Sequence, residues 1–279
     1  MRTTSAWVRT LGDGSAGRPF LREDERCTSL HFDLTAVQSR MRRADPSALE
    51  LEYTQAMMGF LLWQPAPRSM LMIGLGGGSL PKYCHRHLPE ADITVIEIDA
   101  DVISLRETFH VPPDGERFRV FREDGAAFVA RTAASGRRYD VIMVDGFDAS
   151  GQPGSLCTPR FYANCRTLLH PEGLLVANLH NDAHCERWIR RISRSFQGMV
   201  TTVITRNRGN RIAFAGGLTR GDFDSRWTVL HEVHRRTLGK IAGRLKQVMR
   251  ETGSSAAPTT IDGGRRRDWR RPNHDEAGS

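Results

Sequence analysis

Short apolar runs alternate with amphipathic segments through the middle of this chain, in the order typical of an α/β protein. The pattern predicts strands over residues 70–73, 93–98, 118–121, 141–144 and 174–179, with helices over 79–87, 102–109, 126–132 and near 159–169. Residues 200–205 and 211–215 fit a closing hairpin around 207–210. Apolar strands that alternate with helices indicate a parallel sheet covered on both faces.

The two ends of the chain depart from this alternation. Residues 1–45 are rich in turn formers and predict an N-terminal β-rich piece, with one alternating segment at 27–34. Apolar spacing of three and four residues over 46–63 predicts a helix that leads into a Rossmann-like domain ending near 216. Basic helices are predicted for 217–251 and a disordered tail, poor in apolar residues, for 252–279.

Charge and composition refine the picture at a few points. Residues 186–250 carry 15 Lys/Arg and 4 Asp/Glu, a net of +11. Such a section fits solvated helix faces or contact with a polyanion, and we expect the former and no nucleic-acid partner. Five cysteines without a CxxC pair indicate reduced thiols in a cytoplasmic protein, and the longest apolar run is too short for a membrane span.

A glycine-rich turn follows the strand predicted over 70–73. Gly74, Gly76 and Gly78 form a G-x-G-x-G sequence ahead of a predicted helix. Glycines let the backbone approach a ligand closely, and the helix N-terminus supplies free N–H groups. The dinucleotide fingerprint has a third glycine where this chain has Ser79, so the turn favours an adenosyl-sulfonium cofactor over NAD.

Acidic residues end the next two predicted strands. Glu97 follows Gly74 by 23 residues, close to the spacing at which a carboxylate meets ribose hydroxyls. Asp124, followed by Gly125, ends the third strand, where an acid can accept a hydrogen bond from an adenine amino group. An aspartate before a helix is also a common N-cap, so a structural role stays open for these acids.

Two carboxylates three residues apart, Asp145 and Asp148, end the strand predicted over 141–144. A Gly/Pro/Ser-containing loop over 149–158 follows them and could fold over a ligand. The pair fits turn and loop-bracing residues, or an acidic pocket in which one carboxylate accepts a proton from an amine nucleophile. We favour the pocket, because an amine is nucleophilic only when it is neutral.

No metal is expected from the sequence. Cys84-His85-Arg86-His87 lies on one predicted helix, where side chains two residues apart, such as those of His85 and His87, do not share a face. His180 and His184 have helical i, i+4 spacing beside Cys185, but no second pair completes a tetrahedral site.

The segment VDGFDASGQPGSLCTPRFY, residues 144–162, resembles VDSSDPVGPAESLFSEEFY of the spermidine synthase family, the polyamine aminopropyltransferases. The resemblance extends from about residue 30 to 179. It implies a Rossmann-like sheet of the S-adenosylmethionine-methyltransferase type with a small N-terminal β-domain, usually in a homodimer. It also implies Asp145 as proton acceptor and Asp148, Tyr53 and Tyr162 at the amine substrate, a polyamine such as putrescine.

The donor site follows from the same resemblance. VIEID resembles the family's VEID, which implies Glu97 on the ribose of decarboxylated S-adenosylmethionine. EDGAAFV resembles GDGFEFL, which implies Asp124 and Gly125 at the adenine, and Gln38 in AVQS resembles a glutamine near the cofactor.

Two departures from the family leave the reaction open. The family's glycine turn reads GGGDGG, and its aspartate, which helps hold the aminopropyl end of the donor, is Gly77 here. Its Tyr-His-Glu becomes Tyr53-Thr54-Gln55, which removes another acid. The alternatives are a methyltransferase that uses intact S-adenosylmethionine and a non-catalytic relative that binds an adenosyl ligand.

Overall fold

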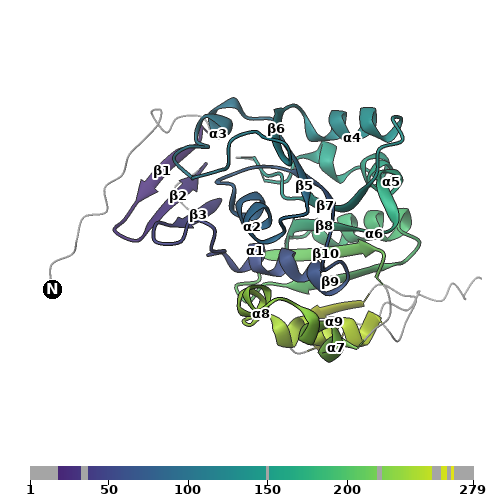
Figure 1. Cartoon of the computed structure of the whole chain (residues 1–279). Coiled ribbons are helices and arrows are strands. Elements are labelled where there is room, and N and C mark those ends of the chain that lie inside the picture. The colour runs from purple at the N-terminus through teal and green to yellow at the C-terminus, as the bar shows by residue number, and fades with distance from the viewer. Residues whose placement is uncertain are drawn as a thin grey trace, which may run out of the picture.

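A nine-stranded sheet forms the centre of the computed structural model, which describes residues 18–32, 37–148, 151–218, 222–252, 259–262 and 265–266 (Figure 1). Its order within these residues is β12-β11-β9-β10-β8-β7-β4-β5-β6. Five neighbouring strands are parallel: β4 (Ser69–Ile73), β5 (Asp92–Glu97), β6 (Phe118–Arg122), β7 (Tyr139–Val144) and β8 (Leu169–His180). β10 (Asn210–Gly216) pairs antiparallel with both β8 and β9 (Val200–Ile204).

Each face of the sheet has its own apolar core, because side chains alternate along a strand. Met70 and Met72 of β4 pack into one core, and Leu71 and Ile73 into the other. The first core is covered by α1 (Glu52–Met57), its 3₁₀ continuation η1 (Met58–Leu62), α2 (Ser79–His87) and α3 (Ala100–Ser104). The second is covered by α4 (Gly125–Ala133), α5 (Pro159–Leu168) and α6 (Cys185–Ser195).

The order of strands reverses at β4, which lies between β5 and β7. In open α/β sheets such a reversal leaves a crevice beyond the carboxyl ends of the strands. Backbone hydrogen bonds tie these ends together: the Gly74 N–H donates to the Ile96 carbonyl and the Asp145 N–H to the Ile73 carbonyl, both at 2.8 Å. The glycine turn and the loop after β7 therefore start side by side.

A separate antiparallel sheet lies beside the central sheet, at the left of Figure 1. Its strands are β1 (Phe20–Glu23), β2 (Cys27–His31) and β3 (Ser39–Arg42). The predicted α/β class with a small N-terminal β-domain is confirmed. The predicted domain boundaries near 45 and 216 stay predictions, and residues 1–17 lie outside the described range.

Helix ends account for most differences from the sequence-based expectation. The helix predicted over 46–63 begins only at Glu52. Leu49, which fitted the helical spacing, is instead buried from the loop before the helix. The helix predicted over 102–109 is α3, which ends at Ser104 and is followed by turns. α6 was not predicted, although its buried residues Cys185, Ile189 and Ile192 have helical spacing.

The basic C-terminal section forms three helices, α7 (Phe223–Val229), α8 (Glu232–Leu238) and α9 (Ala242–Thr252), which lie against the first core (Figure 1). Two short strands lie within the tail predicted to be disordered, β11 (Thr259–Asp262) and β12 (Arg265–Arg266), and β11 pairs in parallel with β9. An edge strand offers unpaired backbone groups to a further segment of chain.

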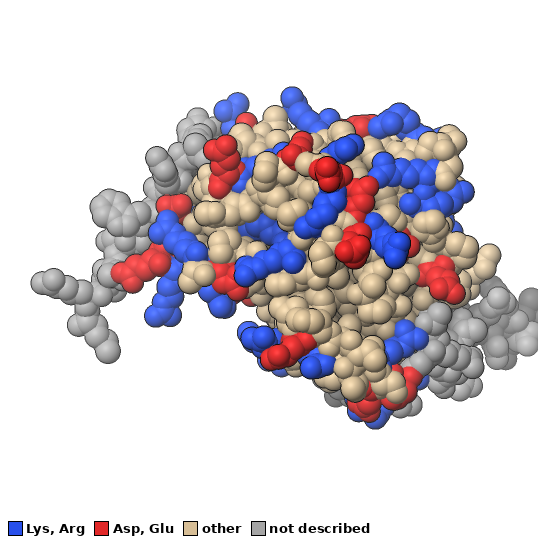
Figure 2. All heavy atoms as spheres, viewed as in Figure 1, with Lys and Arg blue, Asp and Glu red and all other residues tan. Residues whose placement is uncertain are grey.

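Basic and acidic side chains are interspersed over the face shown in Figure 2, and the C-terminal helices at its lower edge carry both colours. Several basic residues of these helices have acidic partners. Arg244 pairs with Glu52, Lys246 with Asp224 at 2.6 Å, and Arg236 with Glu232 at 3.4 Å. Pairing of this kind is typical of solvated helix faces.

No helix within the described part of the chain is long and apolar enough to cross a membrane. All five cysteines lie in described residues, and each is buried with a free thiol.

Lys82 in α2 is a buried cation whose ammonium Nζ donates 2.7 Å to the Phe109 carbonyl, and its side chain is only 3% exposed. Burial lowers its pKa from 10.5 to about 8. Replacing it with methionine (Lys82→Met) is expected to raise the free energy of unfolding at pH 7 by about 1–3 kcal/mol, since no buried charge remains. Urea unfolding followed by circular dichroism measures this.

The pH dependence has a definite sign. Between about pH 8 and 10.5 the unfolded chain keeps the Lys82 proton and the folded chain has lost it, so the cost of burial fades as the pH rises. The gap between the two proteins should close over that range. Lys240→Met, at an exposed lysine, is the control, and an equal gain from both changes would contradict the explanation.

Candidate active site

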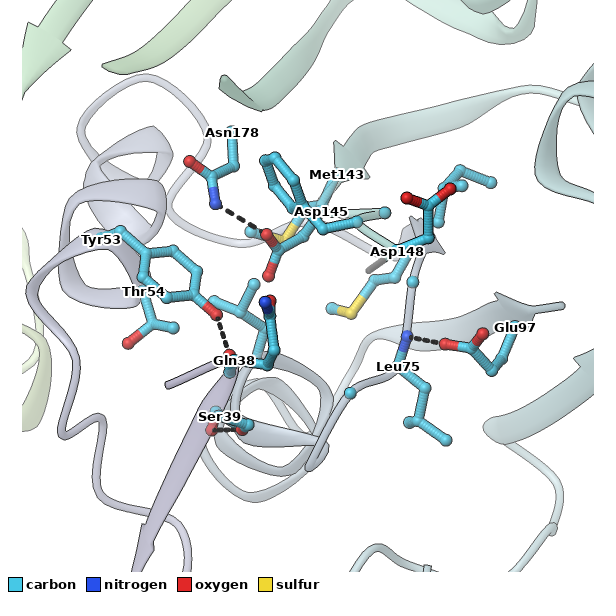
Figure 3. A pocket seen from close by; sticks show the side chains of 18 of the residues that line it. Gln38, Ser39, Tyr53, Thr54, Leu75, Glu97, Met143, Asp145, Asp148 and Asn178 are labelled. Carbon is cyan, nitrogen blue, oxygen red and sulfur yellow. Dashed lines mark hydrogen bonds between the residues drawn. The ribbon is translucent and has the colours of Figure 1, made fainter. Parts of the chain in front are cut away.

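A cavity of about 740 Å³ lies at the carboxyl ends of β4, β5 and β7 (Figure 3). Its wall comes from the start of β3, the first turn of α1, the glycine turn, the end of β5, the start of α4, the loop after β7, the end of β8 and the β9–β10 hairpin. The predicted residues on this wall are Gln38, Tyr53, Gly74, Gly76, Glu97, Asp124, Gly125, Asp145 and Asp148. Residues up to 110 positions apart in the sequence, Gln38 and Asp148, are thus brought to one site.

The glycine turn needs glycine for two separate reasons. Gly74 has φ +98°, and a Cβ there would strike the carbonyl oxygen of Asp145. Gly76 has φ +52°, a left-handed conformation that other residues rarely adopt. Gly78, also predicted to bind the cofactor, has φ +66° and lies at the start of α2, but it does not line the cavity and instead packs on Val111.

Glu97 ends β5 with its side chain 8% exposed, and both carboxylate oxygens accept backbone hydrogen bonds. One oxygen accepts from the Leu75 N–H at 2.8 Å (Figure 3). The other accepts from the Asp99 N–H at 2.9 Å. Glu97 therefore fixes the glycine turn against β5 while it lines the cavity. Each oxygen keeps a further lone pair for a ligand hydroxyl.

Asp124 combines the two roles that the sequence left open. Its carboxylate caps α4 by accepting from the Ala127 N–H at 2.7 Å, and it lines the cavity. Gly125, next in the chain, packs so closely on the side chain of Ile73 that a Cβ would collide with it. The start of α4 therefore forms one wall of the cavity without a side chain in the way.

Asp145 points into the middle of the cavity from the end of β7 (Figure 3). Its Oδ1 accepts a hydrogen bond of 2.8 Å from the side-chain amide of Asn178. Burial raises the pKa of this carboxyl to about 7, while the hydrogen bond from Asn178 and the neighbouring Tyr53 hydroxyl work in the opposite direction. A carboxyl that titrates near neutrality suits a general base at that pH.

Tyr53 and Gln38 lie close to Asp145 in the cavity (Figure 3). The Tyr53 hydroxyl donates to the Gln38 carbonyl at 3.1 Å, and burial, followed by the Asp145 charge, raises the pKa of the tyrosine well above its usual value. Asp148 lies on the exposed loop after β7, where its backbone pairs with Gly151 at 2.9 and 3.0 Å. Two of the three residues predicted at the amine substrate, Tyr53 and Asp148, thus line the cavity.

Tyr162 was also expected at the substrate, and the structure places it elsewhere. It lies in α5 and is fully buried in the second core, with its hydroxyl beside the Cys157 thiol. It is not on the cavity wall. Its match to the family is therefore one of packing, because the side chain faces the sheet and not the crevice.

The charge of the cavity wall is one-sided. Six carboxylates line it, and no lysine or arginine does among the residues that the structure describes. The six are Glu52, Glu97, Asp99, Asp124, Asp145 and Asp148. Glu52 pairs with Arg244. Such a wall attracts cationic ligands and disfavours anionic groups.

Gly77 is tightly packed and does not reach the cavity. A Cβ at this position would lie 2.6 Å from Ser39 Oγ and 2.9 Å from the Phe109 ring, so a side chain has no room there. Two hydroxyls line the cavity beside it, Ser39 and Ser79, with their oxygens 3.1 Å apart. Asp182, an acid that follows β8, is also absent from the wall.

Sequence reasoning missed several polar residues of the wall, chiefly Asn178, Asn210 and His180. Asn178 is 2% exposed and is the one amide in the apolar stretch 174–179, which was a usable signal. Asn210 comes from the hairpin, whose position against β8 depends on strand pairing and not on local pattern. No group of three or more His, Cys, Asp or Glu side chains within the described ranges is arranged to hold a metal ion.

Comparison with known proteins agrees with this geometry. Residues 50–205 match the spermine/spermidine synthase domain. A polyamine aminopropyltransferase of Chromobacterium violaceum is 34% identical over 239 residues, which cover 82% of this chain and 90% of that protein.

Two solved structures share the fold. A probable spermidine synthase from Corynebacterium glutamicum, 20% identical, has a TM-score of 0.66 and covers 97% of this chain and 100% of its own. Human methyltransferase-like protein 13 in complex with SAH, 24% identical, has a TM-score of 0.51 over 71% of this chain and 90% of its own. On the domain match and the Chromobacterium relative, this chain belongs to the spermine/spermidine synthase family.

Proposed function

We propose that this protein is a transferase that moves an aminopropyl group from decarboxylated S-adenosylmethionine to a polyamine such as putrescine. The carrying observation is the cavity wall, with six carboxylates and no lysine or arginine among the described residues. Donor and acceptor are then both cationic, and neither carries a carboxylate that such a wall would repel. The name of the Chromobacterium relative, polyamine aminopropyltransferase, supports the same reaction.

Methyl transfer from intact S-adenosylmethionine is the second candidate, because human methyltransferase-like protein 13 in complex with SAH shares the fold. The carboxylate of intact S-adenosylmethionine would lie in this acidic cavity without a side-chain cation on the described wall. Gly77 leaves no added space for that carboxylate, since Ser39 and Phe109 fill the position. We therefore favour the decarboxylated donor.

In the proposed reaction the acceptor nitrogen attacks the carbon next to the sulfonium. The new C–N bond forms as the C–S bond breaks, and the sulfonium leaves as the neutral thioether methylthioadenosine. Asp145 takes the proton that the nitrogen must lose, and Asp148 holds an ammonium end of the acceptor. Glu97 meets the ribose hydroxyls, while Asp124 and Gly125 lie at the adenine.

The pH dependence of the reaction follows from Asp145. With its pKa raised to about 7, the carboxyl is increasingly protonated below that pH and can no longer accept a proton. A plot of log kcat/KM against pH should therefore steepen by about one unit of slope below pH 7. Initial rates over pH 5.5–9 measure it, and a line without a bend in this range would contradict the assignment.

Product identification by mass spectrometry tests the proposed function itself, with each adenosyl donor offered beside a panel of amines. The expected products are methylthioadenosine and an amine heavier by one aminopropyl unit. S-adenosylhomocysteine as the product would instead establish methyl transfer. Binding of an adenosyl ligand without either product would leave a non-catalytic relative. The proposal also includes a cytoplasmic homodimer, which size-exclusion chromatography with light scattering checks for its oligomeric part.

A further inference from the structure

We propose that Asn178 and Asn210 are positioning residues for Asp145: they form a directed chain of side-chain amides that holds one carboxylate oxygen and leaves the other facing the acceptor nitrogen. The inference rests on the proposed function, in which Asp145 takes the proton. It adds two residues from β8 and the β9–β10 hairpin to the reaction.

The first link is a short hydrogen bond inside the sheet edge. Asn178 Nδ2 donates to Asp145 Oδ1 at 2.8 Å, across the parallel pair β7 and β8. Asn178 is 2% exposed in a strand whose other residues near this point, Ala177 and Leu179, are fully buried and apolar. A buried amide needs partners, and here both ends of the side chain have one.

The second link fixes the direction of the first. Asn178 Oδ1 accepts from Asn210 Nδ2 at 3.0 Å, so the carbonyl end of the Asn178 amide faces β10 and the NH₂ end faces Asp145. If the amide were reversed, a carbonyl oxygen would lie against the carboxylate, and the two acceptors would repel each other. Asn210 therefore keeps the donor pointed at Asp145.

Asn210 is itself held at the base of the hairpin. Its N–H donates to Thr205 Oγ1 at 3.1 Å, and its carbonyl accepts from the Thr205 N–H at 3.0 Å. In the antiparallel ladder Asn210 is paired with His180 and Ile212 with Asn178, so the two asparagines are diagonal neighbours. The position of Asp145 thus depends on the register of the β8–β10 pair.

This chain of amides has a chemical consequence for the free oxygen of Asp145, which points toward Gln38 and the centre of the cavity (Figure 3). Without the Asn178 donor, the ionised form loses a hydrogen bond and the carboxyl can rotate about its side-chain torsions. The pKa of Asp145 should then rise beyond about 7, since Asn178 acts to lower it. The other titratable groups on the wall are Tyr53 and Glu52 from α1, Glu97 and Asp99 at the end of β5, Asp124 before α4, Asp148 on the same loop and His180 of β8.

The test compares Asn178→Leu and Asn210→Leu with Asn181→Leu. Asn181 is a matched control: it follows the same strand and its Nδ2 donates 3.0 Å to the Arg208 carbonyl of the same hairpin, but it is not on the cavity wall. Asn178→Leu is expected to lower kcat by about 10–100-fold and to move the bend in the pH profile up by about one unit. Asn210→Leu should act in the same direction by about 3–10-fold, the double variant should be less than additive, and Asn181→Leu should resemble the wild type.

A second readout does not depend on turnover. The carboxyl ¹³C shift of Asp145, assigned by its loss in Asp145→Asn, reports the titration midpoint directly. An unchanged midpoint in Asn178→Leu, or an equal loss of activity in Asn181→Leu, would overturn the inference; if Asn178→Leu does not fold, Asn178→Ala takes its place. If the wild type makes no aminopropyl product but Asn178→Leu still shifts the midpoint, the proposed function is refuted and the positioning role is kept.

Discussion

Replacing Asp145 with asparagine is expected to lower kcat for aminopropyl transfer by about 100- to 10,000-fold. The amide has nearly the same shape as the carboxyl, but it cannot take the proton that the acceptor nitrogen loses. Affinity for methylthioadenosine should change little, because Glu97, Asp124 and the glycine turn remain in place. Steady-state kinetics and isothermal titration calorimetry measure the two effects separately.

The loss of turnover in Asp145→Asn should not come from unfolding. Burial raises the pKa of Asp145, so its ionised form destabilises the folded state at neutral pH and a neutral amide removes that cost. Asp145→Asn should therefore be at least as stable as the wild type at pH 7.5. Asp182→Asn, at an aspartate outside the cavity, is the matched control. Undiminished turnover in Asp145→Asn would remove Asp145 from the reaction.

Replacing Gly74 with alanine should destabilise the protein by about 2–4 kcal/mol and abolish donor binding. Two effects add: φ is +98°, and the new Cβ would collide with the Asp145 carbonyl. To avoid this collision, the glycine turn and the loop after β7 would have to separate, but backbone hydrogen bonds join both to neighbouring strand ends. Chemical unfolding and calorimetry with methylthioadenosine measure the two losses.

Gly115→Ala is the control for this change. A Cβ at Gly115 would meet nothing within 4 Å, and its φ is not in the left-handed region, so we expect a change of about 0.5 kcal/mol or less. If Gly74→Ala were as stable as Gly115→Ala, the turn would have to be far more adaptable than its contacts indicate.

The sequence predicted the parallel sheet well because its strands are buried on both faces and stand out as apolar runs. β4, β5, β6 and α2 were predicted within a residue of their observed bounds. Helix ends were predicted less well, since a buried loop residue such as Leu49 has the same periodicity as a helical one. α6 was hidden by the arginines on its exposed side, and pairing of β11 with β9 depends on contacts far apart in the sequence.

Residues that follow strands were the most predictable part of the site. Glu97, Asp124 and Asp145 could be grouped because the carboxyl ends of parallel strands lie at one edge of a sheet. Tyr162 was assigned wrongly because a motif records identity and not the direction of a side chain on α5. Asn210 could not be found, since its place beside Asn178 is set by strand register across 32 residues of chain.

The packing around Gly77 limits how this protein could have diverged from relatives with an aspartate in the glycine turn. A side chain at position 77 requires Ser39 of the N-terminal sheet and Phe109 after α3 to move or to become smaller. A change from glycine to aspartate at position 77 alone would therefore give a strained protein, and a change from aspartate to glycine alone would give a loosely packed one. We expect the three positions to change together over evolution, so that reversal of Gly77 to aspartate is tolerated only in a background that already carries smaller residues at 39 and 109.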